Sequence, residues 1–218
     1  MDLSQIEAFL DSPNPQSRMK AITALRNYEP DAVVPLLKRR ANDKEFVIRS
    51  FVVMGLGYKR NEEGFEALLE VIEYETDPNV VAEAANSLSK FGSQSLPSLV
   101  TLFEQNNHWL VRQSILATLD DFDCLEVILK LCRLGCNGED LVVRRGAISH
   151  LIRLEGTALE AEALEILCRA AADSNAYIRT GAARALRHFG SEQAKAALAE
   201  LRQDPDHRVV GAVLEGLL

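Results

Sequence analysis

The chain has 218 residues, of which 47% are hydrophobic, and this is enough apolar material for one domain with a continuous core. Aromatic residues make up only 6%, whereas Ala and Leu are plentiful, which favours helices over sheets. The formal net charge of −8 argues against non-specific binding to nucleic acid or to membranes, because both need a basic field on the protein.

Targeting and redox signals are consistent with a reducing compartment. Asp2 stands where a secretory signal needs Lys or Arg, and no apolar run approaches the length of a membrane span. The four cysteines, Cys124, Cys132, Cys136 and Cys168, contain no CxxC pair and are too sparse for a disulfide scaffold. We therefore expect a cytoplasmic protein that does not contact a membrane.

Seven segments of the chain share one phrase. It starts with Arg or Val at position 0, has small or apolar residues at positions 3 and 4, and ends with Leu at position 7. In chain order the segments are RMKAITAL (18–25), RSFVVMGL (49–56), VAEAANSL (81–88), RQSILATL (112–119), RRGAISHL (144–151), RTGAARAL (179–186) and VGAVLEGL (210–217). Their regular spacing along the whole chain indicates an internal repeat.

Each repeat is expected to be a helix pair. Positions 0, 3, 4 and 7 of the phrase lie on one face of a helix, an apolar helical segment precedes each phrase, and a turn rich in Asp, Asn, Pro or Gly separates the two. One pair cannot bury its apolar stripe alone, but a stack of pairs can. The sequence therefore predicts an all-α, right-handed α-solenoid of about seven short HEAT-like helix pairs in a single curved domain. The expected repeats span approximately residues 1–29, 30–59, 60–92, 93–121, 122–155, 156–190 and 191–218.

Two segments carry a family resemblance. DPNVVAEAANSLSKFGS (77–93) and DSNAYIRTGAARALRHFGS (173–191) combine a turn Asp with an Ala-rich second helix and the ending Leu-x-x-Phe-Gly. This pattern resembles the phycobilisome-lyase-like HEAT-repeat family of cyanobacteria, which includes the E/F-type phycobilin lyases and the NblB-type phycobilisome-degradation factors. The resemblance covers nearly the whole chain at the level of the repeat, although Val81 and Val210 replace the usual Arg.

The resemblance implies a protein-binding scaffold or adaptor that acts in phycobilisome or bilin handling through its concave face. A second role that it implies is that of an accessory to an A-type iron–sulfur cluster scaffold protein. The expected partner is thus another protein, either a phycobiliprotein or an iron–sulfur scaffold, and not nucleic acid. If the chain has an activity, the resemblance implies one like that of a bilin lyase, with transient bilin binding.

Catalytic and metal-binding motifs are missing from the sequence. No G-x-S-x-G, HExxH, P-loop or dinucleotide fingerprint occurs, and His108, His150, His188 and His207 fall in four different repeats without ligand spacing. We expect no catalytic residue, no metal site and no resident cofactor.

Five of the phrases open on arginine, at Arg18, Arg49, Arg112, Arg144 and Arg179. These residues have two interpretations, a ladder that binds a ligand or structural groups that pair with the carbonyls and carboxylates of neighbouring turns. The structural interpretation is favoured, because a residue that recurs in most repeats usually serves the stacking that every repeat must do.

The exposed face of the second helices is the predicted binding surface, and positions 1, 2, 5 and 9 of the phrase point toward it. Phe51, Met54 and Tyr58 form an apolar stripe on this face and are candidate anchors for a partner. The alternative is that they pack against the first repeat. Asn86 and Gln113 occupy the same face in the third and fourth repeats.

A basic cluster is predicted on the same face of the fifth and sixth repeats. It consists of Arg145, Arg153, Arg184 and His188, with Ser149 between them. In an acidic chain this local change of sign indicates a site for carboxylates, either on a protein or on the propionates of a bilin. The alternative is a solvated polar face whose charges are met by acids from neighbouring loops.

The cysteines divide into two kinds. Cys132 continues an apolar helical stripe and is expected in the core. Cys136 lies between Gly135 and Gly138 at the end of that helix, so it is the candidate for an accessible thiol.

Overall fold

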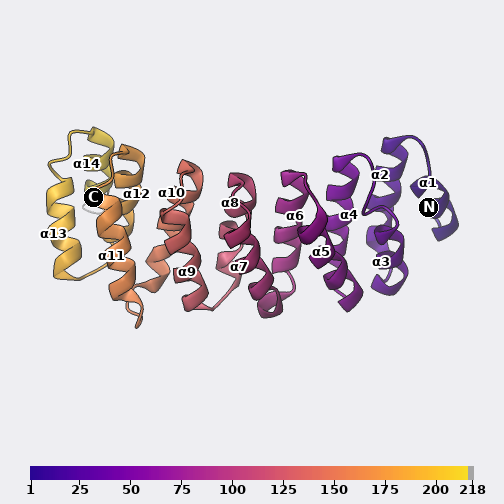
Figure 1. Cartoon of the computed structure of the whole chain (residues 1–218), viewed down its shortest axis with the longest axis horizontal. Coiled ribbons are helices and arrows are strands. Elements are labelled where there is room, and N and C mark those ends of the chain that lie inside the picture. The colour runs from indigo at the N-terminus through magenta and orange to yellow at the C-terminus, as the bar shows by residue number, and fades with distance from the viewer. Residues whose placement is uncertain (216–218) are drawn as a thin grey trace. The chain divides into compact units, whose positions relative to one another are not determined.

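The computed structural model describes residues 1–215, and these residues form helices and turns with no strand among them. The described part divides into two compact units, and the boundary between them in the sequence lies between Phe122 and Asp123. The first unit contains four helix pairs (Figure 1). They are α1 (Leu3–Leu10) with α2 (Pro15–Ala24), α3 (Pro30–Lys38) with α4 (Phe46–Lys59), α5 (Glu62–Tyr74) with α6 (Pro78–Ser89), and α7 (Leu96–Gln105) with α8 (Trp109–Ala117).

The second unit, from Asp123 onward, contains three helix pairs. They are α9 (Leu125–Cys136) with α10 (Leu141–His150), α11 (Glu160–Ala171) with α12 (Ala176–Leu186), and α13 (Glu192–Leu201) with α14 (His207–Leu214). Short 3₁₀ turns follow or precede some of these helices, at Leu25–Asn27, Gly92–Ser95, Leu119–Asp121 and Leu151–Leu154. The prediction of an all-α solenoid of seven helix pairs is confirmed. Leu217, which closes the seventh phrase, lies outside the described residues.

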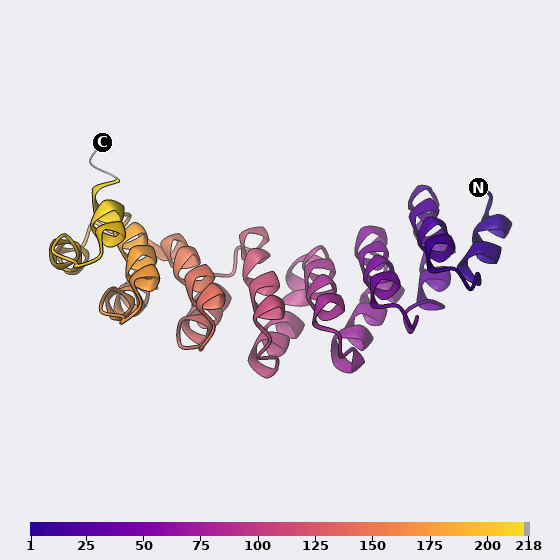
Figure 2. The same cartoon turned by 90° about the horizontal axis from the view of Figure 1, so that it is seen from above.

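Within each unit the helices form two rows, one of first helices and one of second helices (Figure 2). The second helices pack more closely against one another than the first helices do, both along α2, α4, α6 and α8 and along α10, α12 and α14. The apolar positions of each phrase are buried between the rows, as Val52, Val53 and Leu56 illustrate in α4. Stacking therefore provides the core that a single pair lacks.

The polar turns inside the pairs start the second helices. The side chain of Asn14 accepts a hydrogen bond from the backbone N–H of Gln16, and Asp140 accepts from the N–H groups of Val142 and Val143. The same N-cap arrangement occurs at Asp77, His108, Asn175 and Asp206. These caps satisfy backbone donors that a helix start leaves without a partner, which is why Asx residues recur at this place.

The five phrase-opening arginines donate to backbone carbonyls of their own repeat. The accepting carbonyls are those of Ser12 and Pro13 for Arg18, Asp43 for Arg49, Phe103 and Asn106 for Arg112, Cys136 for Arg144, and Asp173 and Ser174 for Arg179. Each arginine thereby fixes the turn that separates its two helices.

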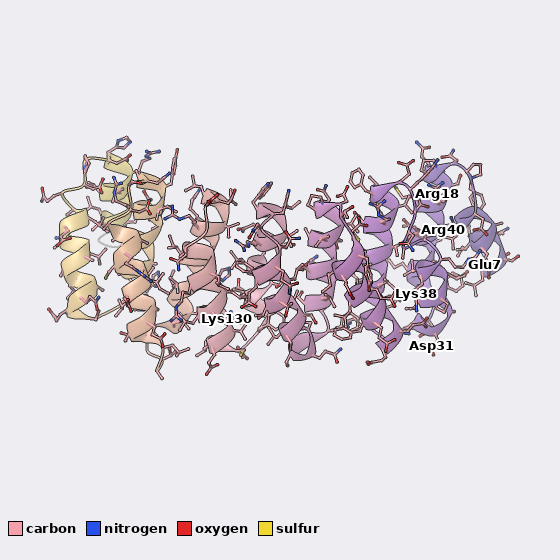
Figure 3. All side chains as sticks on the ribbon, viewed as in Figure 1. Glu7, Arg18, Asp31, Lys38, Arg40 and Lys130 are labelled. Atoms are coloured by element: carbon pink, nitrogen blue, oxygen red, sulfur yellow. The ribbon has the colours of Figure 1, made fainter. Side chains whose placement is uncertain are left out.

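Four of these arginines also bind a carboxylate in the next repeat. Arg18 contacts Asp43 at 2.7 and 2.8 Å, and both side chains are almost fully buried, at 4% and 3% exposure (Arg18 is labelled in Figure 3). Arg179 donates through Nε and Nη2 to the two carboxylate oxygens of Asp204 at 2.7 and 2.8 Å.

Arg49 and Arg144 make the corresponding links. Arg49 pairs with Glu75, and Arg144 pairs with Asp173. Arg112 instead binds the side chain of Asn107 in its own repeat, at 2.7 Å. We infer that the arginine ladder is structural, since each guanidinium is engaged in holding a turn and, in four cases, in tying two repeats together.

A close backbone contact joins α4 to α6. Gly57 faces Ser87 so tightly that a Cβ on residue 57 would lie 2.6 Å from Ser87 Cβ and 2.9 Å from Ser87 Cα. The second of these atoms belongs to the backbone, so it cannot rotate away as the end of a long side chain can. Glycine at position 57 is therefore needed for α4 and α6 to approach this closely.

We predict that Gly57→Ala lowers the free energy of unfolding by about 1–3 kcal/mol, because the added methyl group overpacks the α4–α6 contact. Urea titration followed by circular dichroism measures the effect. Gly211→Ala in α14 is the matched control, since a Cβ there would meet nothing within 4 Å. That variant should be stabilised by up to about 1 kcal/mol through helix propensity alone. Equal effects of the two changes would contradict the contact.

The Arg179–Asp204 pair predicts a pH dependence of stability. The hydrogen bond from Arg179 holds the pKa of Asp204 below its ordinary value of 3.8. The pair therefore stabilises the fold fully above that value, and this contribution is lost as the pH falls through the lower pKa of the folded state. We predict that Asp204→Asn costs about 1–2 kcal/mol at neutral pH and that the difference from wild type shrinks as the pH falls below 3.8 and through the lowered pKa of Asp204.

Urea titrations of both proteins across this pH range provide the measurement. Glu192→Gln is the control, because its exposed pair with Lys195 is expected to contribute nothing measurable. A difference between Asp204→Asn and wild type that persists unchanged at low pH would contradict the role of the ion pair.

Candidate functional site

An apolar groove of about 180 Å³ lies on the first unit, between α2 and α4. Its floor consists of buried core residues from the first two repeats, namely Ile22, Leu25, Val33 and Leu37. The groove remains open because α4 packs less closely against α2 than it does against α6 on its other side.

The apolar stripe predicted from the sequence forms one wall of this groove. Phe51 and Met54 are half-buried and Tyr58 is 61% exposed, and all three line the groove together with Gly55. The structure combines features of both interpretations of the stripe. Its side chains face the first repeat, and they also leave an accessible apolar hollow against it.

Polar groups lie at the rim of the groove. Thr23 is exposed on α2 and its hydroxyl donates to the carbonyl of Met19 at 2.9 Å. Lys59 donates through Nζ to the carbonyls of Arg26, at 2.8 Å, and of Tyr28. The ammonium group of Lys90 lies 4.7 Å from the centre of the Tyr58 ring, a cation–π contact that holds the ring at the edge of the groove.

Elsewhere on the second helices of this unit, fewer residues are exposed than the helical wheel predicts. Asn86 is half-buried and its amide donates to Glu83 at 3.5 Å. Gln113 is also half-buried, and its buried Oε1 has no protein partner among the described residues. Ala82, a position-1 residue expected at the surface, is buried, and its carbonyl accepts from Ser114 at 2.9 Å. Position 1 of the third repeat is therefore covered, whereas the helical wheel places it at the surface.

In the second unit, Arg145 belongs to an arrangement that the sequence analysis did not identify. Its guanidinium carbon lies 5.7 Å from the ring centre of Tyr177, and Arg208 lies 4.4 Å from the same ring. Tyr177 is 46% exposed on α12, two residues before the phrase starts. The signal was the aromatic residue in the first turn of the second helix, a position that the eight-residue phrase does not include.

The remaining members of the predicted basic cluster are distributed among several contacts. Arg184 makes a bidentate pair with Glu215, at 2.7 and 3.0 Å, and Glu215 holds the pKa of that guanidinium above its ordinary value. Arg153 lies 3.9 Å from the carboxylate of Asp123. His188 is exposed just after α12, and the exposed Ser149 donates to the carbonyl of Gly146 at 2.7 Å.

The alternative interpretation of the cluster was that acids of the chain meet its charges, and Asp123 and Glu215 are such acids. For Arg184 the acid is Glu215, which occupies the same phrase position in the next repeat and directly follows the second helix α14. The predicted carboxylate site therefore already contains a carboxylate of the chain itself.

The two neighbouring thiols differ in exposure. Cys136 is partly exposed, and burial raises its pKa to about 12, which outweighs the nearby Arg144 and Arg169. Cys132 is fully buried, as expected from its position in the apolar stripe. Burial therefore disfavours the thiolate form at Cys136, the form that reacts as a nucleophile.

The described residues offer binding surfaces more than chemistry. Within residues 1–215 no group of three or more His, Cys, Asp or Glu side chains is arranged to hold a metal ion. In the same range no helix is both long and apolar enough to cross a membrane. Two of the surfaces that this part of the chain presents are the apolar groove in one unit and the arginine–tyrosine surface in the other.

Comparison with known proteins agrees with the repeat architecture. A family model of HEAT repeats matches residues 41–120 and 128–217, which is most of the chain. No curated protein sequence matches it.

Several solved structures are similar in fold. The Escherichia coli protein YibA is 14% identical, with a TM-score of 0.66, over the whole of this chain and 84% of that one. The CpcE–CpcF complex of phycocyanin lyase from Nostoc sp. PCC7120 is 20% identical, with a TM-score of 0.56, over the whole of this chain and 95% of that one. An engineered protein is 16% identical, with a TM-score of 0.54, over 97% of this chain and 66% of that one. At these identities the likeness shows the fold alone.

Proposed function

The chain belongs to the HEAT-repeat family, and from this premise we propose that it is a scaffold that binds another protein along the face formed by its second helices. Helix-pair repeats of this kind stack into extended surfaces suited to binding proteins.

The observation that supports this proposal is the groove between α2 and α4. A half-buried Phe51 and Met54 beside a largely exposed Tyr58 form a concave apolar patch, which is the usual composition of the anchoring centre of a protein interface. The other repeats place polar or small residues at the corresponding positions, so stacking does not require these three side chains. Their exposure costs solubility unless a partner covers them.

We further propose that the partner is a phycobiliprotein, so that the chain acts in bilin or phycobilisome handling. Two observations support this narrower role: the repeat-level resemblance of segments 77–93 and 173–191, and the fold that the chain shares with the CpcE–CpcF phycocyanin lyase complex. The exposed Arg145 of the second unit offers a group that pairs with a bilin propionate. The alternative role beside an iron–sulfur scaffold gains no support from the structural relatives.

We predict that immobilised wild-type protein retains a partner from an extract of its own organism and that Met54→Asp reduces this retention by at least about tenfold, because a buried charge opposes apolar docking. Tyr58→Ala should reduce it less. Mass spectrometry of the retained proteins provides the measurement.

Tyr74→Ala is the matched control, since Tyr74 is also exposed but lies on the first helix α5. Circular dichroism must show unchanged helicity in every variant. Retention of the same protein by wild type and Met54→Asp in equal amount would exclude the groove as the binding site.

For the narrower role, we predict that mixing the protein at micromolar concentration with a phycobiliprotein or free bilin shifts the visible absorption band, because a bound bilin changes its conformation and surroundings. Arg145→Glu should weaken the shift by removing an exposed charge without breaking an ion pair. An unchanged spectrum with both probes would contradict bilin handling and leave the scaffold role intact.

A further inference from the structure

The groove between α2 and α4 differs in charge from the rest of the chain. The protein has a formal net charge of −8, yet the described residues that line this groove include two basic side chains, Arg26 and Lys59, and no acidic one. A third cation, Lys90, lies over the ring of Tyr58 at the edge. An apolar hollow in an acidic protein is therefore surrounded by positive charge.

This positive charge is not cancelled within the protein. Among the described residues, neither Arg26, Lys59 nor Lys90 forms an ion pair with a carboxylate. Arg26 is exposed. Lys59 bonds to backbone carbonyls and Lys90 to an aromatic ring, and both of these acceptors are neutral. The field of the three cations is thus available to a bound group.

The groove is unsuited to an extended peptide. Its floor and most of its wall are apolar side chains, and of its two hydroxyls, those of Thr23 and Tyr58, the first already donates to the carbonyl of Met19. An extended backbone placed here would lose its hydrogen bonds to water without gaining replacements, which is costly for each buried N–H or C=O group. A helix satisfies its own backbone groups, so it can present side chains alone to such a surface.

The size of the groove limits how many side chains enter it. Its volume of about 180 Å³ is enough for one or two side chains of the size of Leu or Phe. Two such anchors on one helix face are spaced three or four residues apart. Residues that flank these anchors on the same helix would lie over the rim, where Arg26 and Lys90 stand.

We propose that this groove binds an acidic amphipathic helix of the partner protein, with apolar residues at i and i+3 or i+4 in the groove and Asp or Glu side chains facing Arg26 and Lys90. The proposal rests on the scaffold function put forward above and specifies the chemistry of its partner. Apolar contact supplies the affinity, and the three cations select the sign of the charge on the bound helix.

Synthetic helices test this directly. The first probe is a fluorescein-labelled peptide of about 16 residues with Leu and Phe at i, i+3, i+4 and i+7 and Glu on the flanks. The second replaces every Glu with Lys. Fluorescence anisotropy with the full chain should show the acidic helix bound at least about tenfold more tightly than the basic one, and its affinity should fall as salt is added.

Two variants separate the contribution of the positive charge to binding from the contribution of the apolar hollow. Arg26→Glu combined with Lys90→Glu should weaken the acidic helix by about tenfold or more and improve the basic one. Thr23→Trp fills the groove from the exposed side of α2 and should abolish binding of both. Lys44→Glu combined with Arg202→Glu is the control, because it makes the same change of net charge at exposed positions outside the groove and should leave the preference unchanged.

Equal binding of the acidic and basic helices would show a groove selective only for apolar surface and would overturn the proposal, as would the absence of binding by either. A control variant that weakens the acidic helix as much as Arg26→Glu with Lys90→Glu would also overturn it. If Met54→Asp still prevents capture from extract while the acidic helix shows no preference, the scaffold function stands and only the partner's chemistry is wrong.

Discussion

The fold depends on an arginine at the start of the second helix that acts on two repeats at once. One edge of its guanidinium binds carbonyls of its own turn, and in four repeats the other edge binds a carboxylate in the turn of the next repeat. A planar group with five donors is suited to this task, because it satisfies several acceptors in a fixed geometry. In these four repeats one side chain therefore links the turn of its own repeat to the turn of the next.

The same constraint explains where the repeats differ. At position 81 valine replaces the arginine, and there the second helix α6 is almost entirely enclosed by apolar contact and by the close approach of Gly57 and Ser87. In the fourth repeat Arg112 binds Asn107 of its own turn. Neighbouring repeats in this protein are thus held together in two ways, by polar links between turns and by close packing of small residues between second helices.

Residues that stacking does not use are free to recognise a partner. The groove lies beside α4 on the side where α4 has the smaller contact, with α2, and its exposed side chains and cations belong to positions that vary from repeat to repeat. In the second unit the same freedom has a different result, since Arg184 is paired with Glu215 and Arg145 lies against Tyr177. The position of a charged residue on the exposed face thus does not by itself make that residue available to a partner.

The sequence predicts the seven helix pairs and the burial of the phrase, because a 3.6-residue period and Asx turns are local properties that recur in seven copies. It also places Phe51, Met54 and Tyr58 on one helix face. The tertiary structure was needed to show that these side chains line a hollow, that Ala82 is covered and that Glu215 reaches Arg184. Each of these outcomes depends on the distance between neighbouring second helices, which is set by packing of residues about 30 positions apart and not by the period of any one helix.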